Sequence, residues 1–191
     1  MATISSKAPP EIPVSEGSDV ARMEVYLLRH GEAGTRVPIP GKDTERALTV
    51  AGREEVEEVG EGMGALKLKF DVIATSPLKR AKESAEIVAK ALKQKKSTVE
   101  EWPELRPEAD RTTFYKRLGR LKPGSTVLCV GHEPYLSTAL GEITGAGEGT
   151  PHIRVVMKKA GLARLTVTGF SPKITGELRW LLTPRLLRKL A

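Results

Sequence analysis

The sequence predicts one α/β domain: a three-layer α/β/α sandwich with helices on both faces of a mostly parallel central sheet. Two observations lead to this prediction. Short apolar segments alternate with segments of helical periodicity through most of the chain, which is the pattern of parallel strands joined by crossover helices. The length of 191 residues suits one domain, and no internal repeat or second change in composition divides it.

Strands are expected where short apolar runs end at a turn or a polar residue. Residues 23–28 and 126–130 contain the apolar runs 25–28 and 127–130, typical of strands buried on both faces. The strands near the C-terminus are joined by short connections, so we expect them to add an antiparallel edge. The expected strands are 23–28, 70–74, 98–101, 126–130, 153–157, 162–168 and 177–182.

Helices are predicted from apolar stripes and from start signals. Ser76 followed by Pro77 is typical of a helix start, with Ser76 as the N-cap and Pro77 at the first position. Further helices are expected at 111–121, 133–144 and 184–190. An earlier long helix has an apolar face, made by Leu48, Val56, Val59, Met63 and Leu66.

Residues 1–22 differ in composition from the rest of the chain. They are rich in Pro, Ser, Lys and Glu and have no apolar period, so we expect a flexible tail followed by one domain at 23–191. The N-terminus has no apolar segment typical of a secretory signal, and no run reaches the ~20 apolar residues of a membrane span. A cytoplasmic protein that does not enter a membrane is the expectation.

Charge and cysteine content narrow the classes of partner. The net charge of +7 favours anionic partners such as phosphate esters or phosphoproteins, although a solvated lysine-rich surface is the more common cause of such a charge. Nucleic-acid binding is not expected, because aromatics make up 4% of the chain and form no stacking platform.

The single cysteine, Cys129, lies in an apolar run and predicts a buried structural thiol. No metal-type cysteine spacing is present, so neither a metal nor a cofactor is expected.

Chemistry-bearing residues gather where three expected strands end. These clusters are residues 29–32, 75–80 and 131–133. Ligands of open α/β sheets bind beyond the carboxyl ends of the strands, so we expect the clusters to meet. Arginines and helix starts bind phosphoryl oxygens, and a neutral imidazole can attack phosphorus. The sequence therefore predicts a phosphate pocket at this edge.

Four segments of the chain, three of them at these clusters, resemble the histidine phosphatase superfamily, which includes the cofactor-dependent phosphoglycerate mutases. Residues 28–32, Leu-Arg-His-Gly-Glu, are similar to its signature, and residues 75–81, Thr-Ser-Pro-Leu-Lys-Arg-Ala, to its second motif. Residues 130–134, Val-Gly-His-Glu-Pro, are similar to the motif around its second histidine. Residues 48–52, Leu-Thr-Val-Ala-Gly, resemble its Leu-Thr-x-x-Gly helix entry. The resemblance spans roughly residues 23–187 and implies a phosphoglycerate mutase-like fold.

Within the family, the chain most resembles the compact SixA-type phosphohistidine phosphatases. It is short and has no long helical insertion between the second and third motifs. Residues 46–49, Arg-Ala-Leu-Thr, are similar to the Arg-Pro-Leu-Thr of that branch, and residues 178–184 resemble its C-terminal strand. The resemblance implies a metal-independent phosphatase that acts through a phosphohistidine intermediate, on phosphohistidine proteins.

The resemblance also implies a role for each matching residue. His30 is the candidate nucleophile, and Gly31 lets substrate and backbone approach without a Cβ in the way. Arg29 and Arg80 clamp phosphoryl oxygens, while His132 donates to one of them. Ser76 and Arg46 complete the phosphate-binding set, Arg46 as part of a basic rim.

The general acid is the least defined part of the expected site. Glu104 is the family-like candidate, and Glu32 is a poorer one. A phosphoramidate substrate needs a weaker acid than an alkyl ester, because imidazole nitrogen is a better leaving group than an alkoxide. Phosphatase action on a small phosphorylated metabolite and non-catalytic binding of phosphate or a phosphoprotein remain alternatives. The sequence does not define the oligomeric state.

Overall fold

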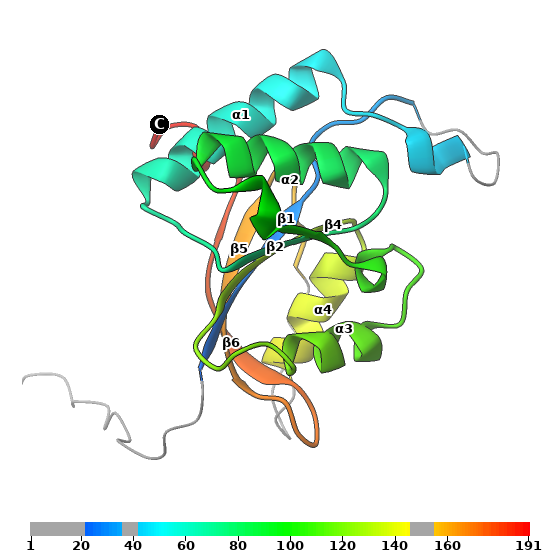
Figure 1. The fold of residues 1–191 in the computed structure, drawn as a ribbon, viewed down its shortest axis with the longest axis vertical. Coiled ribbons are helices and arrows are strands. Elements are labelled where there is room, and N and C mark those ends of the chain that lie inside the picture. Colours follow the sequence, from blue (N-terminus) through cyan, green and yellow to red (C-terminus); the bar gives the residue numbers. More distant parts are fainter. Residues whose placement is uncertain (1–21, 36–41, 146–154) are drawn as a thin grey trace, which may run out of the picture.

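The computed structural model describes residues 22–35, 42–145 and 155–191. The expected tail therefore lies outside the described residues except for Arg22. The described chain builds one six-stranded sheet in the order β3-β2-β4-β1-β5-β6 (Figure 1). Its strands are β1 (Met23–Arg29), β2 (Val72–Thr75), β3 (Val99–Glu101), β4 (Thr126–Gly131), β5 (Leu162–Gly169) and β6 (Thr175–Leu182).

The sheet has a parallel part and an antiparallel edge, as the sequence predicts. Strands β3, β2, β4 and β1 run parallel to their neighbours. Strand β5 pairs antiparallel with β1 and with β6, and a short turn joins β5 to β6. The short turn allows β6 to reverse direction directly after β5, whereas parallel neighbours need longer crossover connections.

Helices cover both faces of the sheet and complete the three layers (Figure 1). On one face, α1 (Val50–Ala65), α2 (Lys79–Ala91) and α5 (Pro184–Leu187) pack on Tyr26 and Leu28 of β1. On the other, α3 (Arg111–Leu118) and α4 (Tyr135–Thr144) pack with alternate residues of the same strand. None of the helices in the described part of the chain is long and apolar enough to cross a membrane.

Helix α1 forms as its sequence pattern indicates, except at its end. Thr49 caps it by accepting a hydrogen bond from the Gly52 amide at 2.9 Å. Val56, Val59 and Met63 are fully buried, whereas Leu66 lies past the last turn and is exposed. Its inclusion in the apolar face was therefore wrong, because the helix ends before Leu66 can turn toward the sheet.

Two expected boundaries are also wrong. Helix α2 begins at Lys79 with Leu78 as its N-cap, so Ser76 and Pro77 precede the helix instead of starting it. Residues 155–157 of the expected strand 153–157 are not a strand, and residues 153–154 lie outside the described residues. The place beside β1 is taken by β5, which leaves no free sheet edge there for this segment.

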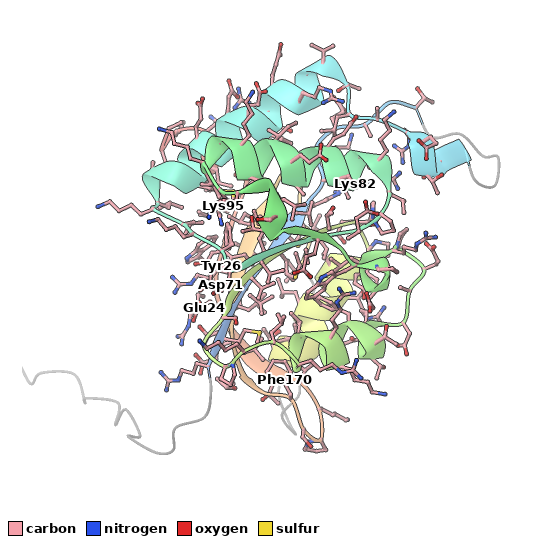
Figure 2. The ribbon with its side chains drawn as sticks, viewed as in Figure 1. Glu24, Tyr26, Asp71, Lys82, Lys95 and Phe170 are labelled. Atoms are coloured by element: carbon pink, nitrogen blue, oxygen red, sulfur yellow. The ribbon has the colours of Figure 1, made fainter. Side chains whose placement is uncertain are left out.

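The strand register brings the expected clusters to one edge. Arg29 of β1 is level with Gly131 of β4, and the His30 amide donates to the Gly131 carbonyl at 3.0 Å. On the other side of β4, the Ser76 amide donates to the Val130 carbonyl at 3.0 Å. The residues that follow β1, β2 and β4 are thus neighbours. Figure 2 shows Phe170 at the end of the molecule opposite to Lys82, which lies on α2 near this edge.

Candidate active site

Two buried histidines face each other where β1 and β4 end. The ring centroids of His30 and His132 are 5.0 Å apart. The two side chains belong to residues only 7% and 2% exposed. Both rings are therefore within reach of one small tetrahedral anion, which is the geometric requirement of the predicted pocket.

The hydrogen bonds of His30 fix which nitrogen is free to react. Its Nδ1 lies 2.7 Å from the Gly31 carbonyl oxygen, which can only accept, so Nδ1 carries the proton. Nε2 then has an available lone pair and accepts a hydrogen bond from Arg80 Nε at 3.2 Å. Burial, and then the nearby Arg80 and Arg29, lower the pKa of His30 to about 4, against the upward effect of the Gly31 carbonyl. The ring is neutral at pH 7, as a nucleophile must be.

His132 is held by the segment that follows β2. Its Nε2 lies 2.8 Å from Ser76 Oγ, and Ser76 is fully buried. Burial, followed by the proximity of His30 and Arg80, lowers the pKa of His132 to about 2. Ser76 Oγ thus contacts His132 and also accepts from the Leu78 amide at 3.4 Å, just before α2, and it orients the second imidazole.

Arg80 and Arg29 flank the histidine pair. Arg80 is in the first turn of α2 and almost fully buried, with its Nε on His30 and its Nη1 on the Asp43 carbonyl oxygen at 2.9 Å. Arg29 ends β1 and donates from Nη1 to the Met157 carbonyl at 2.8 Å. The segment expected to be a strand around Met157 thus serves to position an arginine.

Buried polar atoms without a partner mark this site. Among the residues that the structure describes, such side-chain atoms are Arg29 Nε, His132 Nδ1 and Glu133 Oε1. An unpaired buried polar group is costly, typically about 1–3 kcal/mol. Arg29 Nε and His132 Nδ1, both buried and without a hydrogen-bond partner, indicate a site where an anionic ligand pairs with them.

Gly31 is required for a reason other than the one expected from the sequence. A Cβ on Gly31 would lie 2.5 Å from Val56 Cγ2 and 2.9 Å from the Gly52 carbonyl oxygen, both on α1. The missing Cβ therefore faces α1, not a substrate. The Gly31 amide also donates to Ser84 Oγ on α2 at 3.1 Å, so this residue fixes the nucleophile loop between two helices.

Arg46 lies at the rim of the site together with a residue that the sequence analysis missed. The short 3₁₀ helix η1 (Lys42–Glu45) presents Asp43, whose Oδ1 accepts from Arg46 Nε at 2.8 Å. Asp43 Oδ2 also lies 3.3 Å from Arg80 Nη1. The spacing of three residues between Asp43 and Arg46 is the signal that could have indicated their contact.

The candidate acids are both in ion pairs away from the histidine contacts described above. Glu104, in the 3₁₀ helix η3 (Pro103–Leu105), accepts from Arg117 Nη1 on α3 at 2.9 Å. Glu32 pairs with Lys159 at 2.9 Å. Neither contact links a carboxyl group to an imidazole, so a general acid at Glu104 stays a prediction.

The described residues give no sign of a metal centre or a reactive thiol. No group of three or more His, Cys, Asp or Glu side chains among them is arranged to hold a metal ion. Cys129 is fully buried in β4, and burial raises the pKa of its thiol. The site is instead a cationic pocket around two neutral imidazoles, which suits phosphoryl transfer through a histidine.

A family model described as the histidine phosphatase superfamily (branch 1) matches residues 25–110. An uncharacterised protein of Picosynechococcus sp. is 34% identical over 145 residues, which cover 75% of this chain and 84% of that protein.

A characterised relative matches over a shorter stretch. The mitochondrial serine/threonine-protein phosphatase PGAM5 of Xenopus laevis is 33% identical over 93 residues, or 46% of this chain. The match covers 32% of the length of that relative. It therefore includes only part of the whole PGAM5 protein.

A solved structure matches over nearly the whole fold. The protein histidine phosphatase SixA, determined in complex with tungstate, has a TM-score of 0.74 and is 24% identical. The alignment covers 86% of this chain and 99% of SixA. The phosphoglycerate mutase-like fold expected from the sequence is thereby confirmed.

Proposed function

The chain is a phosphatase of the histidine phosphatase superfamily (branch 1), and from this premise we propose that it cleaves phosphohistidine on proteins through a phosphorylated His30. The observation that carries the proposal is the unprotonated His30 Nε2 beside Arg80 Nε at 3.2 Å. This hydrogen bond places the nitrogen proposed to attack beside the Arg80 guanidinium, a group that can bind phosphoryl oxygens.

The reaction takes two steps. His30 Nε2 attacks phosphorus, a P–N bond forms, and the bond between phosphorus and the leaving nitrogen or oxygen breaks. The leaving group then takes a proton. Water attacks the phosphorylated His30 next, which releases inorganic phosphate and restores the neutral ring. Arg29, Arg80 and His132 stabilise the charge on the transferred group in both steps.

A phosphohistidine substrate suits the acids that this site offers. Glu104 and Glu32 are each held in an ion pair with a basic side chain. An alkoxide leaving group needs a proton from a strong acid, whereas a departing imidazole nitrogen does not. The likeness in shape to SixA, which is named as a protein histidine phosphatase, also supports this class of substrate.

The test compares three substrates with the purified protein: a phosphohistidine peptide, an aryl phosphate and an alkyl phosphate. We expect the first two to be hydrolysed at least ~100-fold faster than the third, within the range of general acid catalysis. Activity should persist with a chelator present. Equal rates on all three substrates, or loss of activity with the chelator, would contradict the proposal.

The nucleophile is tested on the same preparation. His30→Ala should abolish turnover, whereas wild-type protein quenched during turnover should carry a phosphoryl group that is lost in acid and retained in base. Full activity of His30→Ala would remove His30 from the mechanism and leave only the family assignment.

A further inference from the structure

Asp43 contacts two arginines of the candidate site, Arg46 and Arg80. Its Oδ1 accepts from Arg46 Nε at 2.8 Å, and its Oδ2 lies 3.5 Å from Arg46 Nη2. The same Oδ2 is 3.3 Å from Arg80 Nη1. One carboxylate thus bridges two guanidinium groups, one of which contacts the nucleophile His30.

We propose that the Asp43 carboxylate is an internal competitor of the phosphoryl group: it partners Arg80 and Arg46 and weakens the binding of oxyanions to them. This inference deepens the proposed function and rests on it for the identity of the ligand. Its role is distinct from catalysis, since Asp43 acts through the arginines.

The chemistry of the groups supports competition. Carboxylates and phosphoryl groups both accept paired hydrogen bonds from the edge of a guanidinium, so they use the same donors. Arg46 already commits Nε and Nη2 to Asp43 and Nη1 to the Gly34 carbonyl at 3.0 Å. Three of the five N–H groups of Arg46 are thus engaged, so a phosphoryl oxygen binds the edge formed by Nε and Nη2 only if it shares or replaces Asp43.

Charge supports the same conclusion. The charges of Arg29, Arg80 and Arg46 lower the pKa of His30. The Asp43 carboxylate has the opposite effect and raises the pKa of His132. In a partly buried site, repulsion between a carboxylate and a phosphoryl dianion is screened less than at the surface. A fixed negative charge beside the anion site should therefore lower its affinity for substrate and for released inorganic phosphate.

This arrangement has a use in turnover. A pocket with several arginines binds its product, inorganic phosphate, with the same contacts that it uses for the substrate. A carboxylate that returns to the arginines as phosphate leaves compensates their charge in the empty pocket and favours release.

The experiment removes the charge while the shape is kept. Asp43→Asn is isosteric and retains an oxygen that can accept from Arg46. We expect the dissociation constants of inorganic phosphate and tungstate, measured by calorimetry, to fall at least tenfold, with a matching fall in KM for the aryl phosphate. Asp43→Ser, which also lacks the charge, should change the constants in the same direction.

The matched control is Glu45→Gln, which removes an equal charge from the same 3₁₀ helix, where Glu45 is exposed. It should alter the constants less than twofold. Unchanged or weaker oxyanion binding in both Asp43 variants, with thermal unfolding unchanged, would overturn the proposal and assign Asp43 a positioning role. Calorimetry needs no turnover, so failure of the proposed function, seen as absent activity in wild type, is distinguishable from failure of this inference.

Discussion

Arg80 Nε lies 3.2 Å from His30 Nε2 and donates a hydrogen bond to it, the nitrogen of that ring that carries no proton. The other nitrogen, Nδ1, is committed to the Gly31 carbonyl at 2.7 Å. The ring can therefore attack only on the side where Arg80 stands. Binding of a phosphoryl group by Arg80 and attack by His30 share one geometry, so a change to either residue should disturb both.

Replacement of Arg80 is expected to lower kcat/KM for an aryl phosphate by at least ~100-fold, because a preorganised donor to the transition state is lost. Arg80→Lys should recover little of this, since an ammonium group cannot contact His30 and a phosphoryl oxygen with a fixed planar edge. Steady-state kinetics provides the measurement. The control is Lys79→Ala, the exposed neighbour on the same turn of α2. Recovery of near wild-type kcat/KM by Arg80→Lys would contradict this role.

Ser76→Ala should lower kcat about tenfold and cost about 1–3 kcal/mol of stability, because it leaves the buried His132 Nε2 without a partner. The Ser76 hydroxyl and His132 Nε2 are 2.8 Å apart, and without this contact the imidazole loses its fixed orientation. Kinetics and urea unfolding of the variant separate the two effects. Ser97→Ala, at an exposed serine, should change neither. An unchanged kcat would show that Ser76 has no part in orienting His132.

The sequence was sufficient to predict the sheet and the meeting of the main site residues. Buried parallel strands are continuous apolar runs, and the residues that follow them converge because parallel strands share one carboxyl edge. That rule places His30, Ser76 and His132 together without any knowledge of packing. The predicted α/β/α layers and the antiparallel edge followed from connection lengths in the same way.

Features that depend on contacts between distant segments could not be predicted. Ser76 precedes α2 and contacts His132, a residue 56 positions away in the chain. Arg29 donates a hydrogen bond to the Met157 carbonyl, although the two residues are 128 positions apart in the chain. Asp43 was missed because a charged residue in a polar loop usually faces solvent, and only the tertiary structure brings Arg80 to it.

Gly31→Ala is expected to destabilise the fold by about 2–3 kcal/mol, as overpacking of a closed core site does. The new Cβ would lie 2.5 Å from Val56 Cγ2, and the backbone oxygen of Gly52 at 2.9 Å cannot move aside easily. The control is Gly34→Ala, where a Cβ meets nothing within 4 Å, so the change should stay within about 0.5 kcal/mol. Urea unfolding measures both. Equal stability of the two variants would contradict the packing role of Gly31.

The low pKa of His30 should be visible in its titration. Burial, with the charges of Arg80 and Arg29, lowers this pKa to about 4 in the folded chain, against 6.5 for a free histidine. The His30 ring protons, followed by NMR, should therefore titrate near pH 4 and stay unchanged between pH 6 and 8. Assignment by comparison with His30→Gln identifies the signals. A midpoint near 6.5 would contradict the buried neutral ring.

The same shift predicts how stability depends on pH. Between pH 4 and 6.5 the unfolded chain binds a proton at His30 that the folded chain does not, so acid favours unfolding. The free energy of unfolding should thus rise as the pH increases from 4 to 6.5 and then lose this dependence, with His30 contributing roughly 3 kcal/mol. His132, whose pKa is lowered to about 2, adds to the slope over the same interval. Urea unfolding at several pH values, in wild type and His30→Gln, measures the difference, because the variant keeps only the His132 contribution. A variant with the full wild-type slope would show that the ring of His30 is not desolvated in the folded state.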